Sequence, residues 1–225
     1  MSREQFVSVN GTDSRKSPIV YGVPQGSILG PLLFIIYIND IPEISKHAKM
    51  VLYADDANII ITGANMDEIQ VKVSELASNL LNWVQCNGLA LNLKKTYYMV
   101  FTNRRINTDI ELRINNIVIK RVTETRFLGV LIDEKLTWKS HISAMRAKMS
   151  RYVGIMYKLK GILPLKVRLQ IYHSFVQSHL NYCSLVWGFS AKANIEKLFS
   201  SQKKGYAQLC LPILVFFRLF NILIR

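Results

Sequence analysis

Cysteine is scarce in this sequence of 225 residues, and its three thiols follow no recognisable pattern. Cys86, Cys183 and Cys210 are odd in number, and their spacing matches no zinc site. We therefore expect no disulfide framework and no disulfide partner. The first five residues, MSREQ, are polar and do not begin a signal peptide. These absences predict an intracellular protein, nuclear or cytoplasmic, that is not secreted.

The sequence also lacks an uninterrupted apolar run of membrane-spanning length at its C-terminal end. Residues 209–224 are largely apolar, but Pro212, Arg218 and Asn221 interrupt them. A membrane span needs about 20 predominantly apolar residues. We therefore expect no stable membrane association and interpret residues 209–225 as an exposed apolar tail that is prone to aggregate, with a membrane helix as the alternative.

Acidic residues are missing from a long stretch of the chain. Residues 1–134 hold 14 basic and 14 acidic side chains. Residues 135–194 hold ten basic and no acidic side chains, and residues 195–225 hold five basic side chains and one acidic side chain. The formal net charge, 29 − 15 = +14, therefore belongs to the C-terminal portion. A basic half beside a neutral half is typical of proteins that bind a polyanion, most often nucleic acid. The alternative is a solvated, lysine-rich helical face.

Half of the residues are hydrophobic, which is enough for a folded core, and their spacing predicts strands first and helices later. Pro31 fits the first turn of a helix, Pro42 ends that apolar run, and Gly88 is placed to cap a helix. The other expected elements are strands at 50–53, 57–62, 96–102, 110–114, 117–121 and 127–132, a hairpin turn at 115–116, and helices at 66–87, 139–160 and 165–182. This order predicts the α+β class.

Two adjacent carboxylates, Asp55 and Asp56, stand between two apolar strands in the segment MVLYADDANIIIT. Their mutual repulsion is relieved by a cation, and hard divalent ions such as Mg²⁺ take oxygen ligands. Two such ions about 3.5–4 Å apart stabilise the attacking and leaving oxygens of phosphoryl transfer. The alternative is a plain Asp-Asp turn, since aspartate tolerates turn geometry.

Four segments, in this order, resemble motifs of reverse transcriptases, most strongly those of jockey-like non-LTR retrotransposons. They are residues 22–31 (GVPQGSILGP), 53–56 (YADD), 87–96 (NGLALNLKKT) and 127–138 (FLGVLIDEKLTW). The set covers roughly residues 3–204 and is specific because its members occur together. The resemblance implies a partial polymerase palm, an antiparallel sheet with helices, in residues 1–134. It also implies a basic helical thumb-like region in residues 135–208, followed by the tail 209–225.

The resemblance assigns roles to the first two segments. Asp55 and Asp56 are similar to two of the three metal-binding carboxylates of the palm, which implies two Mg²⁺ ions in an intact enzyme. Gly22, Pro24, Gln25 and Gly26 resemble the loop that contacts the template and the incoming nucleotide. Without the acidic pair, this segment would be an ordinary loop before a helix.

Roles also follow for single residues near the acidic pair. Tyr53 would contact the nucleotide or the primer, and packing within the strand is an equally good interpretation. Lys95 resembles the lysine near the nucleotide phosphates, where it would stabilise or protonate the leaving pyrophosphate. Lys94 is the other candidate for this role. Alternatively, each lysine is a solvated residue at the end of a strand.

Phe127, Leu128 and Gly129 resemble the primer grip, although they also suit a core. Beyond them, basic side chains of the predicted helices would follow a phosphate backbone, and aromatic ones would stack on bases or form the core. The basic residues are Arg146, Lys148, Arg151, Lys158, Lys160, Lys166 and Arg168, and the aromatic ones are Tyr152, Tyr157, Tyr172 and Trp187. The four histidines are scattered, so we interpret them as structural or surface residues.

The sequence departs from the family at both ends. The third palm carboxylate is expected tens of residues before the GVPQG loop, and nothing before Gly22 matches it; Asp13 lies in a polar turn instead. We therefore expect a truncated chain. The resemblance implies RNA-directed DNA polymerisation with an RNA template, a DNA primer and deoxynucleoside triphosphates. We expect this fragment to be inactive. A non-enzymatic nucleic-acid-binding remnant that uses the basic helices is the alternative.

Overall fold

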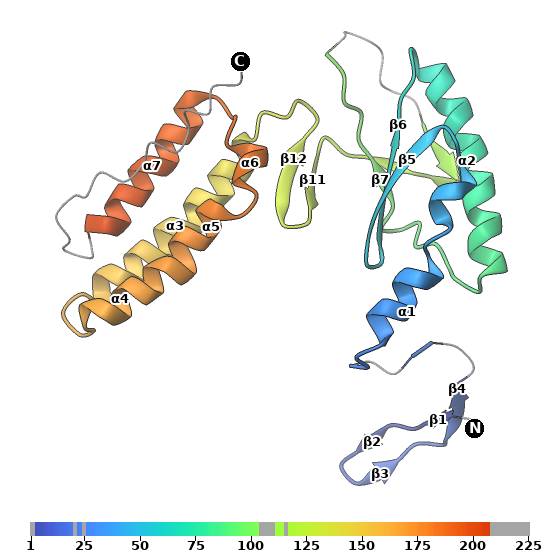
Figure 1. Cartoon of the computed structure of the whole chain (residues 1–225), viewed down its shortest axis with the longest axis horizontal. Coiled ribbons are helices and arrows are strands. Elements are labelled where there is room, and N and C mark those ends of the chain that lie inside the picture. Colours follow the sequence, from blue (N-terminus) through green and yellow to red (C-terminus); the bar gives the residue numbers. More distant parts are fainter. Residues whose placement is uncertain (1–2, 20–21, 24–25, 104–110, 115–116, 208–225) are drawn as a thin grey trace. The chain divides into compact units, whose positions relative to one another are not determined.

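Figure 1 shows the computed structural model of the chain, which describes residues 3–19, 22–23, 26–103, 111–114 and 117–207. The chain forms two compact units. The first unit comprises residues 1–96 and 108–120, and the second comprises residues 97–107 and 121–225. The described elements are helices and small two-stranded sheets, in agreement with the α+β prediction. Their assignment to a palm and a thumb stays a prediction.

Four short strands open the first unit and form one long hairpin. β1 (Arg3–Gln5) pairs antiparallel with β4 (Ser17–Ile19), and β2 (Ser8–Val9) pairs with β3 (Thr12–Asp13). Asn10 and Gly11 form the turn with φ of 51° and 78°. Two positive φ values in a two-residue turn match the right-handed twist of the strands, and Asn-Gly tolerates them.

Helix α1 (Gly30–Tyr37) carries Pro31 in its first turn, as predicted. The prediction for Pro42 was wrong, because α1 ends five residues earlier and Pro42 lies in the first turn of the 3₁₀ helix η1 (Ile41–Ile44). Proline suits this position because the first N–H groups of a helix have no partner to lose. The apolar face of α1 is largely uncovered, with Leu32, Leu33, Ile35, Ile36 and Tyr37 all exposed.

Helix α2 (Met66–Cys86) agrees with the predicted helix over 66–87. The Asn65 side chain accepts a hydrogen bond from the Glu68 N–H at 2.9 Å, and this bond caps the N-terminus. Gly88, with φ of 62°, ends the helix as predicted, while the Leu89 N–H donates to the Val84 carbonyl oxygen at 2.9 Å. The helix packs against η1, β6 (Asp56–Ile61) and β8 (Arg113–Ile114), and β8 pairs with β9 (Ile117–Val118). The turn predicted at 115–116 lies outside the described residues.

The strands of the second unit differ most from the sequence-based expectation. β7 (Tyr97–Tyr98) is much shorter than the predicted strand 96–102, and β10 (Lys120–Arg121) is equally short. The prediction of one strand over 127–132 was wrong. β11 (Glu124–Phe127) and β12 (Val130–Asp133) form a tight hairpin instead. The chain reverses at Leu128 and Gly129, because both have positive φ, 44° and 86°.

Helices build the rest of the second unit. They are α3 (Lys139–Leu159), α4 (Leu165–Tyr172), the π-helical turn η2 (His173–Gln177), α5 (Ser178–Asn181), α6 (Ser184–Trp187) and α7 (Lys192–Ala207). The helices predicted over 139–160 and 165–182 are therefore confirmed, the second with a π turn inside it. Within the described ranges, no helix has both the length and the apolar character needed to cross a bilayer.

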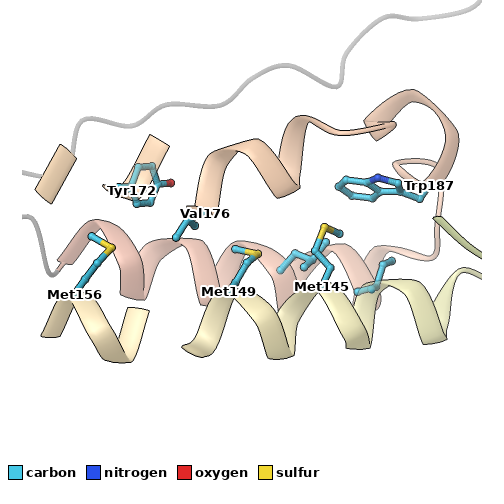
Figure 2. Packing of buried hydrophobic residues seen from close by; sticks show 8 residues of the cluster. Met145, Met149, Met156, Tyr172, Val176 and Trp187 are labelled. Carbon is cyan, nitrogen blue, oxygen red and sulfur yellow. The ribbon is translucent and has the colours of Figure 1, made fainter. Parts of the chain in front are cut away.

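One methionine-rich cluster forms the core of this helical unit (Figure 2). Met149, Met156, Tyr172 and Val176 are fully buried, and Trp187 is 5% exposed. Helix α7 approaches α3 closely at Gly205, where a Cβ atom would lie 3.2 Å from the Tyr172 ring and 3.3 Å from a Val153 methyl group. Removing apolar surface from water in this cluster is the main source of stability in the unit.

Candidate functional site

The predicted acidic turn is the end of a regular hairpin. β5 (Ala48–Tyr53) and β6 are antiparallel, and their last pair joins Tyr53 to Asp56. Ala54 and Asp55 form the two-residue turn, with Ala54 at φ of 49°. A left-handed alanine costs about 1 kcal/mol, so the pairing of the strands holds this turn in a strained conformation. Asp55 therefore lies in the turn, and Asp56 is the first residue of β6.

Both carboxylates are exposed, and no ion pair of the described residues involves either of them. Carboxylate oxygens are the donors that hard divalent cations prefer, so the chemistry of the pair fits such an ion. In the part of the chain that the structure describes, however, no cluster of three or more His, Cys, Asp or Glu side chains is able to hold a metal. The hairpin thus supplies two carboxylates and not a complete ligand set.

Tyr53 lies on the same exposed face of the hairpin as its neighbour Val51. The Tyr53 side chain is 60% exposed, and the Val51 side chain is 41% exposed. Side chains two residues apart in a strand share a face, so this apolar strip leads directly to the acidic turn. An aromatic ring at its end is accessible to a ligand that lies beside the carboxylates.

The structure describes only part of the predicted GVPQG loop. Gly22 and Gly26 have φ of 86° and 82°, values that glycine adopts without the steric cost of a Cβ atom. Pro24 and Gln25 lie outside the described residues. Gly30 is buried, and a Cβ atom there would lie 3.2 Å from a Val23 methyl group, so the start of α1 packs closely on the loop.

Lys95 lies in a turn that Asn92 organises. The Lys95 N–H donates to the Asn92 carbonyl oxygen at 3.1 Å, and the Thr96 hydroxyl donates to the same oxygen at 2.9 Å. Lys94 and Lys95 are both exposed. No ion pair of the described residues joins Lys95 to Asp55 or Asp56.

The predicted primer-grip residues form the β11–β12 turn in the second unit. Phe127 and Leu128 are half-buried, and Gly129 is exposed. The Tyr182 hydroxyl donates to the Leu128 carbonyl oxygen at 2.5 Å, and a Cβ atom at Gly129 would lie 3.5 Å from the Tyr182 ring. The turn is therefore fixed against the helix α5 region by a residue that the sequence did not single out.

His141 holds the same hairpin from helix α3. Its Nδ1 accepts a hydrogen bond from the Leu131 N–H at 3.3 Å, and its side chain is 8% exposed. Burial lowers the pKa of His141, and the nearby charges of Arg126 and Lys148 lower it further. The scattered spacing of the histidines gave no signal for this contact, because it joins residues from a strand and a helix.

The basic and aromatic residues of the helices separate into two groups. Arg146, Arg151, Lys158, Lys160 and Lys166 are exposed, and Lys148 is half-buried. Arg168 was assigned wrongly to the surface, because it is 9% exposed and its Nε–H donates to the Leu163 carbonyl oxygen at 3.2 Å. Tyr172 and Trp187 belong to the core, so of the two interpretations given for them, base stacking and core packing, the structure supports core packing.

The amino-acid sequence is similar to known proteins over most of its length. A family model described as "Reverse transcriptase (RNA-dependent DNA polymerase)" matches residues 2–132. The chain is 28% identical over 213 residues to "RNA-directed DNA polymerase from mobile element jockey" of Drosophila melanogaster. It is 27% identical over 209 residues to "Probable RNA-directed DNA polymerase from transposon X-element" of the same organism. Both alignments cover 90% of this chain.

A third similar protein is "Retrovirus-related Pol polyprotein from type-1 retrotransposable element R1" of Nasonia vitripennis. It is 25% identical over 198 residues, which is 81% of this chain and 58% of that protein. The chain spans only 23% of the length of the jockey and X-element proteins. No solved structure matches the chain.

Proposed function

The chain belongs to the reverse transcriptase family, and we propose that it carries the carboxylate hairpin and the primer-binding helical region of an RNA-directed DNA polymerase. The observation that carries this proposal is the β5–β6 turn, which presents Asp55 and Asp56 together and exposed. Its substrates would be deoxynucleoside triphosphates, with a DNA primer on an RNA template. The matched relatives bear the name of this activity.

Asp55 and Asp56 would hold Mg²⁺ at the hairpin turn, together with a carboxylate from elsewhere in a complete active site. Bound there, the metal would supply charge stabilisation for the attacking and leaving oxygens. In the reaction, the 3′-hydroxyl of the primer loses its proton to water as its oxygen bonds to the α-phosphorus of the nucleotide, and the bond to the leaving pyrophosphate breaks. The hairpin contributes rigidity, because the pairing of Tyr53 with Asp56 fixes both carboxylates on one short loop.

The remaining predicted residues would position the reactants. Lys95, exposed at the end of its turn, would neutralise or protonate the leaving pyrophosphate. Gly22, Pro24, Gln25 and Gly26 would contact the template and the incoming nucleotide. Tyr53 would pack against the nucleotide or the primer beside the carboxylates.

The helical region would hold the primer strand. Phe127, Leu128 and Gly129 would contact the primer end through the backbone of the β11–β12 turn. The exposed cations of α3 and α4 would follow the phosphate backbone, so binding would weaken as the salt concentration rises. We keep residues 1–134 as the proposed palm part and residues 135–208 as the proposed thumb part.

Two carboxylates hold two metal ions less well than three, so we propose that this chain alone does not extend a primer. The test is primer extension on an RNA template with Mg²⁺, comparing the chain alone with a fusion to the N-terminal region of the jockey polymerase. We expect extension by the fusion only, and its loss in the Asp55→Asn fusion. Asp67→Asn, an exposed acid in the first turn of α2, is the matched control. Extension by the Asp55→Asn fusion would refute the assignment of the hairpin.

A non-enzymatic nucleic-acid-binding function is the second candidate. The observation that favours it is the run of exposed cations in residues 135–194, which contain no acidic side chain. It predicts salt-dependent binding to RNA or DNA that survives the double change Asp55→Asn and Asp56→Asn. Binding that is lost with the two carboxylates would count against it.

A further inference from the structure

A basic groove runs along helix α3 in the second unit. It joins Lys148 and Arg151, two of the cations predicted to follow a phosphate backbone, to His179, for which the sequence predicted only a structural or surface position. Two adjoining hollows of about 60 and 240 Å³ lie there, and Lys148 and His179 line both. The first reaches the β11–β12 hairpin, and the second continues along α3. We call this feature the α3 groove, defined by Arg126, His141, Lys148, Arg151, Tyr152 and His179.

No acidic side chain lines either hollow. The ion pairs of the described residues do not involve Arg126, Lys148 or Arg151. The acids nearest the groove along the chain are Glu124, on β11 two residues before Arg126, and Asp133 and Glu134, on β12 and just after it. Glu124 is exposed and lines neither hollow, and the other two are engaged elsewhere. Asp133 accepts hydrogen bonds from backbone N–H groups at the start of α3, and Glu134 pairs with Arg121 at 3.2 Å. Among the described residues, no ion pair therefore neutralises the cations that line the groove.

The two histidines of the groove experience this charge. Burial lowers the pKa of His179, and the charge of Lys148 lowers it further. His141 is perturbed in the same direction, first by burial and then by Arg126 and Lys148. An anion in the groove would oppose the repulsion from these cations, so it would favour the protonated form of a histidine that contacts it.

The two histidines differ in their exposure and in their hydrogen bonds. His141 is 8% exposed, and its Nδ1 already accepts the hydrogen bond from the Leu131 N–H. His179 is half-buried and lines both hollows. Its ring lies 5.8 Å from the Tyr152 ring, and Tyr152 in turn lies 5.1 Å from the Phe175 ring. This aromatic row fixes the orientation of His179 at the side of the groove.

We propose that the α3 groove binds a phosphodiester group of a nucleic-acid strand through Lys148 and His179, and that His179 takes up a proton when the phosphate binds. The proposal rests on the proposed function, because the groove borders the turn assigned to the primer end. Lys148 contributes a point charge, and the protonated imidazole contributes an N–H donor. Arg126 and Arg151 add positive charge on either side.

Every titratable group that lines the two hollows with His179 is a cation, a histidine or a tyrosine. Arg126 comes from β11, His141, Lys148, Arg151 and Tyr152 come from α3, and Tyr182 follows α5. With no carboxylate in this set, the added proton is compensated by the phosphate alone. The affinity for nucleic acid should therefore increase as the pH falls from about 8 to about 6.

The test measures binding of a fluorescent DNA oligonucleotide and, separately, of sodium phosphate to the full chain. The readouts are anisotropy across pH and salt and the NMR signals of the His179 ring. We expect the oligonucleotide to move the His179 signals toward the protonated form, and sodium phosphate to do so only at far higher concentration. Equal affinity for both probes would overturn the assignment to a strand in favour of free phosphate.

Two variants and one control separate the groove from general basicity. Lys148→Gln should weaken binding and lower the salt slope by about one, and His179→Gln should abolish the pH dependence while salt-dependent binding remains. Lys158→Gln removes one charge from the same helix outside the groove and should keep the pH dependence. Retained pH dependence in His179→Gln would overturn the assignment of phosphate binding to the groove and leave the proposed function in place. Wild-type His179 signals that do not respond to the oligonucleotide would do the same. Absence of any nucleic-acid binding would overturn the proposed function as well.

Discussion

The Tyr182 hydroxyl donates a hydrogen bond to the Leu128 carbonyl oxygen, and this bond joins residues 54 positions apart in the chain. It ties the β11–β12 turn to the segment that follows α5. Leu128 has a φ of 44°, an uncommon value for a residue with a branched side chain at Cγ. The hydrogen bond is therefore part of what holds a strained turn in place.

Removing this hydroxyl tests that role. Tyr182→Phe should lower the free energy of unfolding by about 0.5–1.5 kcal/mol, the usual net contribution of one hydrogen bond. It should also speed hydrogen exchange of the amides in the β11–β12 turn. Tyr157→Phe is the control, because Tyr157 is 68% exposed. Equal exchange in the turn of both variants would show that the bond does not hold it.

The close approach of α7 to α3 gives a prediction with opposite signs at two glycines. Gly205→Ala should destabilise the chain by about 1–3 kcal/mol, because the new methyl group meets the Tyr172 ring and Val153. Gly154→Ala should stabilise it by about 0.5–1 kcal/mol, because nothing lies within 4 Å and alanine favours a helix. Urea unfolding of the two variants measures both changes. Destabilisation of equal size in both would contradict the packing described at Gly205.

Asp133 organises the start of α3, and its contribution should depend on pH. Partial burial opposes ionisation, but hydrogen bonds from the backbone and hydroxyl of Thr137 and from the Trp138 and Lys135 N–H groups outweigh it. The pKa of Asp133 is therefore lowered from 3.8. Asp133→Ala should cost about 0.5–2 kcal/mol at neutral pH.

The sign of this pH effect follows from the lowered pKa. The ionised form is favoured in the folded state, so the stabilisation is complete above the unfolded pKa of about 3.9 and is lost as the pH falls through the folded value. Denaturant unfolding of wild type and Asp133→Ala at a series of pH values measures it. Glu75→Ala, at an exposed position on α2, is the control. A stability difference that stays constant into strong acid would contradict the stabilisation by ionised Asp133.

His141 also loses its contribution as the pH falls, but at higher pH and because the folded state favours its neutral form and not a charged one. Burial and the charges of Arg126 and Lys148 lower its pKa from 6.5, so the unfolded chain binds the proton more readily than the folded chain. Stability should therefore be complete above about pH 6.5 and decline as the pH falls below it. His141→Gln should flatten this decline in thermal unfolding, whereas the exposed His47→Gln should leave it unchanged. If stability declines in His141→Gln as it does in the wild type, titratable groups other than His141 cause the decline.

Some elements could be predicted from the sequence because their signals are local. Helix α2 combines a 3.6-residue apolar period with a polar N-cap and a glycine at its end, and all three act within one or two turns. The β5–β6 hairpin was predictable because apolar strands flank a short acidic turn. In both cases nearby residues alone decide the conformation.

Other features depend on contacts that no local pattern encodes. The turn at Leu128 was missed because leucine rarely adopts positive φ, and the partner that fixes it, Tyr182, lies 54 residues further along the chain, just after α5. The α3 groove was missed for a similar reason, since His141 and His179 come together only when α5 packs beside α3. Arg168 carried a charge that suggested the surface, although its guanidinium satisfies a carbonyl group at the start of α4.

The uncovered apolar face of α1 has a practical consequence for obtaining the protein. An apolar helix face is ordinarily covered by neighbouring elements, yet Leu32, Leu33, Ile35 and Ile36 are between 48% and 64% exposed. Such a surface is what chaperones recognise on newly synthesised chains. Soluble yield, and not the melting temperature of the helical unit, should therefore limit preparation, and a cleavable carrier fused before Met1 is the natural starting form.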